Sequence, residues 1–331
     1  MAADRDELIN EIEKLKSQID ADFAQDRSAP SAGELLPLYE SVVLMQRRYE
    51  NKLREMKQAA SERDAFYGEM QQIRAEHHMA EEIQRSLLPG NSEKYKEAYY
   101  VDLFADMDTA WEVGGDYYDF FPVDEDHLFF CVGDVSGKGV SAAIFCSVVK
   151  TLISMAVLNG EALDKVCADV SRRMFQSQSS LSKLFVTVWA GIIDRRDGSI
   201  DFVNAGHDAP FLIRRNKEIE TVEERCGLPI ASYYNARKPE KCGYKKAGIR
   251  LEPGDLILLY TDGITDSESS EHERYGSRRM KEKLNEIAGE EMSSRDIAAF
   301  LERGIDSFAD RGERDDDITI LALRYLGKPS C

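Results

Sequence analysis

Four short segments of the chain place an aspartate beside glycine or at the border of an apolar run. They are Gly114–Asp116, Gly133–Gly139, Tyr260–Gly263 and Arg314–Thr319. Aspartates at the strand ends of one fold can converge, and converging carboxylates repel one another unless cations lie among them. The four segments therefore predict a Mg²⁺ or Mn²⁺ site, which is a kind of site that activates water against a phosphate.

Each segment taken alone has a simpler structural explanation. Asp134 follows the apolar run 128–132 and precedes two glycines, a pattern typical of a turn and a helix cap. Asp262 lies in an Asp-Gly turn, and three successive aspartates before a strand are usually solvated or capping. The glycine spacing after Asp134 matches neither a dinucleotide-binding turn nor a P-loop, which disfavours nucleotide binding. Only the combination of all four segments favours the metal site.

Alternating strands and helices are expected to position these aspartates from about residue 95 onward. The expected strands are 99–106, 117–123, 127–134, 183–194, 199–205, 211–215, 255–260 and 318–324. The expected helices are 140–158, 163–176, 277–288 and 294–308. Asp197-Gly198 is a hairpin turn signal, and the Pro-Gly pair in 252–255 indicates a type II turn. This mixture predicts an α+β fold in which helices pack outside antiparallel sheets.

The N-terminal part of the chain has a different pattern, and we expect two domains, residues 1–88 and 89–331. Apolar residues recur at helical spacing from Leu8 to Phe23, and a longer helical pattern ends near Leu87. One heptad register of this second helix has ten apolar positions out of fourteen. It predicts a regulatory and dimerising coiled coil or helical hairpin, the alternative being a single amphipathic helix packed on the next domain.

Composition excludes several classes of protein. The formal net charge of −18 argues against binding to the phosphate backbone of nucleic acids. Six cysteines without a CxxC motif fit a reducing cytoplasm. The N-terminus is polar, unlike a signal peptide, and the longest apolar region, 140–158, is interrupted by Lys150 and several serines. We expect a soluble cytoplasmic protein without a membrane span.

Six segments in the same order resemble a known family. They are 114–120, 133–139, 185–187, 204–207, 260–265 and 315–319, and they are similar to the motifs of SpoIIE-type serine phosphatases in the metal-dependent protein phosphatase (PPM) superfamily. The resemblance covers about residues 85–326, and the layout with its helical N-terminus resembles RsbU-like regulators of bacterial stress signalling. It implies a central antiparallel β-sandwich flanked by α-helices (αββα).

The resemblance also implies a centre of two Mn²⁺ or Mg²⁺ ions. The residues that match the family's ligands are Asp116, Asp134, Val135, Asp262 and Asp316. Asp134 matches the ligand that bridges both ions, and the Val135 carbonyl matches a second contact on one of them. Asp262 and Asp316 match ligands of the other ion. Asp116 matches a ligand of the ion that Asp262 and Asp316 do not bind, directly or through water.

Several neighbouring residues receive lesser roles. Asp119 is expected to orient metal-bound water, while Asp315 and Asp317 take supporting or solvated roles. His207 either protonates the leaving oxygen or, as we favour, satisfies backbone groups in a turn. Lys138 is expected to be exposed. Trp111 is expected to be a core or interface aromatic.

The function implied is hydrolysis of phosphoserine or phosphothreonine on a partner protein. The resemblance points to a phosphorylated anti-sigma-factor antagonist of STAS type as substrate. It also points to an upstream regulatory protein acting on the helical region of a homodimer. The alternative is a catalytically silent scaffold that binds a partner through its helices. A haloacid-dehalogenase-type enzyme is disfavoured because the parallel-sheet pattern is lacking.

Overall fold

The computed structural model describes residues 32–90, 92–177, 184–232, 243–309 and 314–328, together with the isolated helical residues 14, 17 and 21. By its internal contacts the chain divides into two compact units, residues 1–73 and 74–331. The amphipathic pattern predicted between Leu8 and Phe23 lies almost entirely outside the described residues.

A single helix, α2, extends from Ala32 to Leu87 and confirms the long N-terminal helix predicted from the sequence. Its predicted heptad seam faces solvent between Val42 and Phe66 in the single chain, whereas Gln84 at the end of the seam is buried. Val42, Met45, Tyr49, Met56 and Phe66 are each between 44% and 63% exposed. The dimer predicted from this seam stays a prediction.

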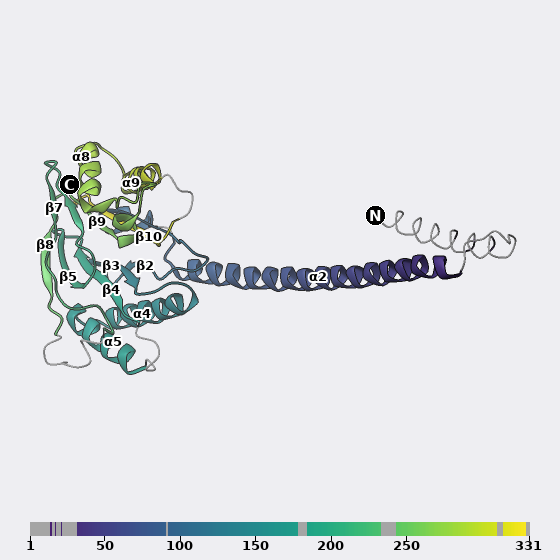
Figure 1. The fold of residues 1–331 in the computed structure, drawn as a ribbon. Coiled ribbons are helices and arrows are strands. Elements are labelled where there is room, and N and C mark those ends of the chain that lie inside the picture. The colour runs from purple at the N-terminus through teal and green to yellow at the C-terminus, as the bar shows by residue number, and fades with distance from the viewer. Residues whose placement is uncertain are drawn as a thin grey trace. The chain divides into compact units, whose positions relative to one another are not determined.

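Two five-stranded antiparallel sheets form the body of residues 74–331 (Figure 1). The first sheet has the order β1 (Val101–Asp108), β10 (Ile318–Tyr325), β9 (Leu256–Tyr260), β6 (Phe211–Ile213) and β7 (Ile219–Thr221). The second has the order β2 (Tyr117–Pro122), β3 (His127–Val135), β4 (Val186–Asp194), β5 (Ser199–Ala205) and β8 (Ala247–Arg250).

Helices cover the outer faces of this sandwich (Figure 1). Helices α4 (Val140–Leu158) and α5 (Leu163–Ser177) lie on the second sheet. Helices α8 (Gly276–Ile287) and α9 (Ser294–Ala309) lie on the first. The predicted αββα sandwich is therefore confirmed.

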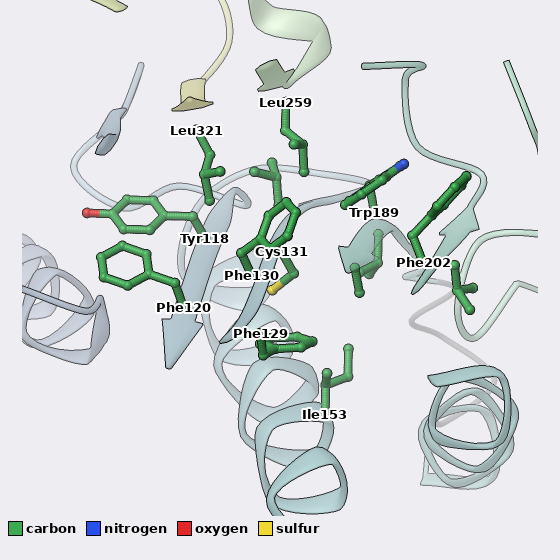
Figure 2. Packing of buried hydrophobic residues seen from close by; sticks show 14 of the residues in the cluster. Tyr118, Phe120, Phe129, Phe130, Cys131, Ile153, Trp189, Phe202, Leu259 and Leu321 are labelled. Carbon is green, nitrogen blue, oxygen red and sulfur yellow. The ribbon is translucent and has the colours of Figure 1, made fainter. Parts of the chain in front are cut away.

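Large apolar side chains from both sheets fill the interior. Trp189 stacks on Phe202 with ring centroids 5.0 Å apart, and Phe130 lies 5.5 Å from Trp189. Leu259 and Leu321 approach this aromatic layer from the other sheet (Figure 2). Each such side chain stabilises the fold by roughly 1.5–3 kcal/mol on burial. A second apolar cluster joins the first sheet to α8 and α9.

Four short elements were not predicted: strands β7 and β8, and helices α3 (Lys94–Ala98) and α7 (Asp262–Asp266). Elements of three to five residues carry too few positions to show a periodicity. The first strand begins at Val101 rather than residue 99, because Tyr100 has φ 53° and breaks the extended conformation. The strand at Phe211 ends at Ile213, where Arg214 turns back to bond with Glu218.

Helix α4 is the one helix in the described part of the chain that is long and apolar enough to cross a membrane. Its buried face, which includes Phe145, Val149 and Ile153, packs on the second sheet. Lys150 on the same helix forms an ion pair with Asp119 of β2, with 3.0 Å between Nζ and Oδ2. These contacts describe a covering helix of the sandwich.

Candidate metal centre

The antiparallel pairing of strands brings the four aspartate segments to one end of the sandwich. Tyr117 at the start of β2 pairs with Gly133 near the end of β3. Tyr260 at the end of β9 pairs with Ile320 near the start of β10. The segments before β2 and β10 and the segments after β3 and β9 therefore lie at the same end of the sandwich.

The carboxylates lie close enough to shift one another's pKa. Burial, followed by repulsion from Asp262 and Asp316, raises the pKa of Asp134 to about 7. Burial and then Asp316 raise the pKa of Asp262 to about 6. Asp116 is buried, and this burial together with the charges of Asp134 and Asp317 raises its pKa well above the ordinary value. Like charges in a poorly solvated site disfavour the ionised form, so cations are the natural complement.

Two threonines hold the carboxylate of Asp116. The hydroxyls of Thr261 and Thr319 each donate a hydrogen bond of 2.7 Å to Asp116 Oδ2. Both threonines are fully buried. No role for either threonine is predicted from the sequence, although both lie within the aspartate segments. They fix the orientation of Asp116.

Asp317 organises the loop that carries Asp116. Its Oδ2 accepts a hydrogen bond of 2.6 Å from the backbone N–H of Gly115, and its Oδ1 accepts one of 2.9 Å from Ala110. A longer contact of 3.5 Å reaches the N–H of Asp116. Asp317 is buried, so the expected supporting role fits and the solvated role does not.

Asp316 and Asp315 are placed differently from Asp317. Lys138 Nζ lies 3.3 Å from Asp316 Oδ1 and also donates to the backbone carbonyl of Asp315. The side chain of Asp315 is exposed. Lys138 is exposed, as predicted, but it also places a positive charge against a predicted metal ligand.

Asp119 and His207 are turned toward the interior of the domain. Asp119 Oδ2 accepts a hydrogen bond of 2.7 Å from Ser154 and pairs with Lys150, so its carboxylate is directed to helix α4. His207 Nδ1 lies 2.9 Å from the hydroxyl of Thr187, and burial lowers its pKa to about 4. A histidine that is neutral at pH 7 and buried in this way fits the turn role, which we favoured, better than proton donation.

Two glycines allow the segments to approach closely. A Cβ on Gly115 would lie 3.0 Å from the carbonyl oxygens of Val135 and Gly137. A Cβ on Gly263 would lie only 2.0 Å from the carbonyl oxygen of Asp317. These approaches place the carbonyl oxygens of Val135, Gly137 and Asp317 against neighbouring segments. Carboxylate and carbonyl oxygens are the donors that Mg²⁺ and Mn²⁺ prefer.

The donor chemistry therefore fits hard divalent cations. Within the described ranges, no three His, Cys, Asp or Glu side chains are already arranged as a metal site. Asp116 and Asp316 are instead engaged by Thr261, Thr319 and Lys138. The assignment of individual ligands stays a prediction.

Residues 124–326 match the family model described as Stage II sporulation protein E (SpoIIE). The chain belongs to the SpoIIE family. The matched range contains Asp134, Val135, Asp262 and Asp316, whereas Asp116 precedes it.

This SpoIIE-family chain is similar to two curated bacterial proteins. It is 25% identical to Protein IcfG of Synechocystis over 269 residues, which cover 73% of this chain and 40% of IcfG. It is 25% identical to Phosphoserine phosphatase RsbU of Bacillus subtilis over 268 residues, which cover 80% of this chain and 75% of RsbU. The chain thus aligns with less than half the length of IcfG.

The fold is that of a PP2C phosphatase domain. The SiaA-PP2C domain of Pseudomonas aeruginosa superposes with a TM-score of 0.65 at 21% sequence identity. The match covers 77% of this chain and 98% of the SiaA domain. At this identity the likeness concerns the fold.

Proposed function

We propose that the protein is a Mn²⁺- or Mg²⁺-dependent protein serine/threonine phosphatase. The observation that carries the proposal is the convergence of Asp116, Asp134 and Asp262 at one end of a sandwich in a SpoIIE-family chain. The relative RsbU is named a phosphoserine phosphatase, which supports phosphoserine as the substrate group.

The proposed ligands are distributed over two cations. Asp134 would bind both, Asp262 and Asp316 would bind one, and Asp116 with the Val135 carbonyl would bind the other. Bound divalent cations lower the pKa of a water molecule and neutralise the charge of a phosphate ester.

The other groups of the site orient these ligands. Thr261 and Thr319 hold Asp116 through their hydroxyls. Asp317 holds the loop before it through backbone N–H groups. The side chain of Lys138 is a point charge at the edge of the cluster and is able to contact a phosphate oxygen.

The proposed substrate is a phosphorylated partner protein, specifically an anti-sigma-factor antagonist of STAS type. The proposed layout assigns residues 1–88 to a regulatory and dimerisation region and 89–331 to the phosphatase domain in the cytoplasm. The exposed seam of α2 supports a homodimer and an upstream protein partner. Gln84, near the end of this helix, supports a link to the site, because its side chain bonds the N–H of Gly114 at 3.0 Å and its carbonyl at 2.8 Å.

The test is hydrolysis of p-nitrophenyl phosphate and of a phosphoserine protein with Mn²⁺ and with EDTA. We expect activity only with the metal, and a loss of more than about 100-fold in Asp262→Asn, because a ligand is removed. Asp266→Asn is the matched control, since Asp266 lies on the same short helix but pairs with Arg274 at the surface. Absence of metal-dependent hydrolysis in the wild type would favour the silent scaffold.

The regulatory part is tested by comparing the full chain with a protein that starts near residue 85. We expect the full chain to be a dimer by light scattering and the shorter protein a monomer with altered phosphatase activity. Equal mass per chain and equal activity would contradict the role proposed for residues 1–88.

A further inference from the structure

A groove with a volume of about 740 Å³ opens beside the candidate metal centre. Asp108 lines it from the end of β1 and Trp111 from the segment that follows. Lys138 lines it from the segment after β3, and Arg314 and Asp315 from the segment before β10. Lys138 also contacts Asp316, so the groove adjoins this predicted metal ligand. A polypeptide whose phosphoserine reached the cluster would pass this groove.

Trp111 is presented to solvent on a well-anchored loop. It is 59% exposed, whereas the other tryptophan, Trp189, is fully buried. Its neighbour Ala110 is held by the carboxylate of Asp317, and Gly115 is held by the same carboxylate. A large aromatic ring on a fixed support loses little conformational entropy on binding, which makes tryptophan a frequent anchor of protein interfaces.

The charged residues that line the groove are two carboxylates, Asp108 and Asp315, and two cations, Lys138 and Arg314. Arg314 lies between two carboxylates, with 2.7 Å to Asp108 Oδ2 and 2.8 Å to Asp306 Oδ1. Lys138 is the second cation, and it faces Asp316. Both cations are therefore engaged, whereas the exposed carboxylate of Asp315 has no ion pair among the described residues. The charge complement of Asp315 is a basic side chain.

We propose that this groove binds the polypeptide that flanks the phosphoserine and selects its sequence. An apolar residue of the substrate packs on Trp111, and a neighbouring Lys or Arg lies against Asp108 and Asp315. The phosphate itself goes to the adjacent cluster. The inference rests on the proposed phosphatase function and deepens it, because it names the residues that distinguish one phosphoserine segment from another.

The test uses p-nitrophenyl phosphate and two phosphoserine peptides that differ at one position. Peptide A carries Leu and Lys beside the phosphoserine, and peptide B carries Leu and Glu. With Mn²⁺ we expect the wild type to favour peptide A by about tenfold in kcat/KM, and added salt to reduce the preference because screening weakens exposed charges. Asp315→Lys should shift the preference toward peptide B.

Trp111→Ala provides the second arm. The ratio of kcat/KM for peptide A to that for p-nitrophenyl phosphate should fall about tenfold, mainly through KM, as expected for an interface anchor. Leu158→Ala is the matched control, because Leu158 is an equally exposed apolar residue at the far end of α4, and it should keep the wild-type ratio. An unchanged ratio in Trp111→Ala overturns the proposal.

Fluorescence gives a readout that does not depend on catalysis. Because Trp189 is buried, acrylamide quenches chiefly Trp111, and Trp111→Phe supplies the background. Peptide A should protect the accessible tryptophan from acrylamide more than peptide B does. If the wild type hydrolyses nothing but peptide A still protects Trp111, the phosphatase function fails and the groove stands. If neither peptide protects Trp111, the groove is wrong whatever the activity.

Discussion

Replacing Gly263 with alanine should separate two of the predicted metal ligands. Gly263 follows Asp262 in the first turn of α7, and it faces the backbone of Asp316 and Asp317. Gly263 does not have a positive φ, so alanine suits its backbone conformation. Any effect of the substitution therefore comes from the added methyl group.

The size of the effect follows from the geometry. The new Cβ would lie 2.0 Å from the carbonyl oxygen of Asp317, whereas real Cβ atoms essentially never approach closer than 3.0 Å. The two segments must therefore move apart by about 1 Å, since both contacting groups are backbone. Overpacking of this kind costs about 1–3 kcal/mol of the free energy of unfolding. Metal–ligand distances tolerate only about 0.2 Å.

The assays measure these two consequences separately. Urea unfolding should show the loss of about 1–3 kcal/mol. Titration with Mn²⁺ should show weaker binding, and hydrolysis of p-nitrophenyl phosphate should fall about 100-fold, as expected for a 1 Å misplacement. Gly248→Ala is the matched control, because its Cβ would meet nothing closer than 3.7 Å and lies on strand β8.

The outcome that would refute this reasoning is specific. Wild-type Mn²⁺ affinity and activity in Gly263→Ala would show that the spacing of the Asp262 and Asp316 segments does not matter for the site. Loss of stability without loss of metal affinity would mean that the close contact is structural only.

Three further predictions concern side chains around the centre. Asp317→Asn should weaken Mn²⁺ binding by about tenfold in a metal titration, because the amide cannot accept both backbone N–H bonds. The matched control is Asp315→Asn at an exposed position, which should change Mn²⁺ affinity by less than about threefold. Burial lowers the pKa of His207 to about 4, so the folded state disfavours its charged form and stability is lost as pH falls from 6.5 toward 4. His207→Gln should therefore reduce the loss of unfolding free energy between pH 7.5 and 5 by about 2 kcal/mol in urea titrations. Lys150→Met leaves the buried carboxylate of Asp119 unpaired and should cost about 3 kcal/mol by urea unfolding, while Lys150→Met with Asp119→Leu should cost less.

Most of the sandwich could be predicted because its long strands are marked by apolar runs between turn signals. Strand β5 has the predicted bounds, and helix α4 has them as well. The convergence of the aspartates followed from their common position at strand ends. Short elements such as β7 and α7 were missed because tertiary contacts rather than local periodicity stabilise them.

The partners that hold the site together could not be predicted from the sequence. The bond from Thr319 to Asp116 joins residues far apart in the chain, and so does the bond from Gly115 to Asp317. Which of three successive aspartates faces inward depends on the register at which β10 begins, and that register is set by its pairing with β1 and β9. A sequence pattern carries the residue types but not these pairings.

The loop from Thr109 to Asp116 joins Trp111, the proposed substrate contact, to Asp116, a predicted metal ligand. Asp317 holds it at Ala110 and Gly115, and Gln84 clamps it at Gly114 through both the N–H and the carbonyl. With both ends fixed, the loop has little freedom to absorb a displacement locally. We therefore expect a displacement of Gln84 or of Trp111 to change the position of Asp116. The restraints that position this predicted ligand are the same ones through which a partner or a substrate would act on it.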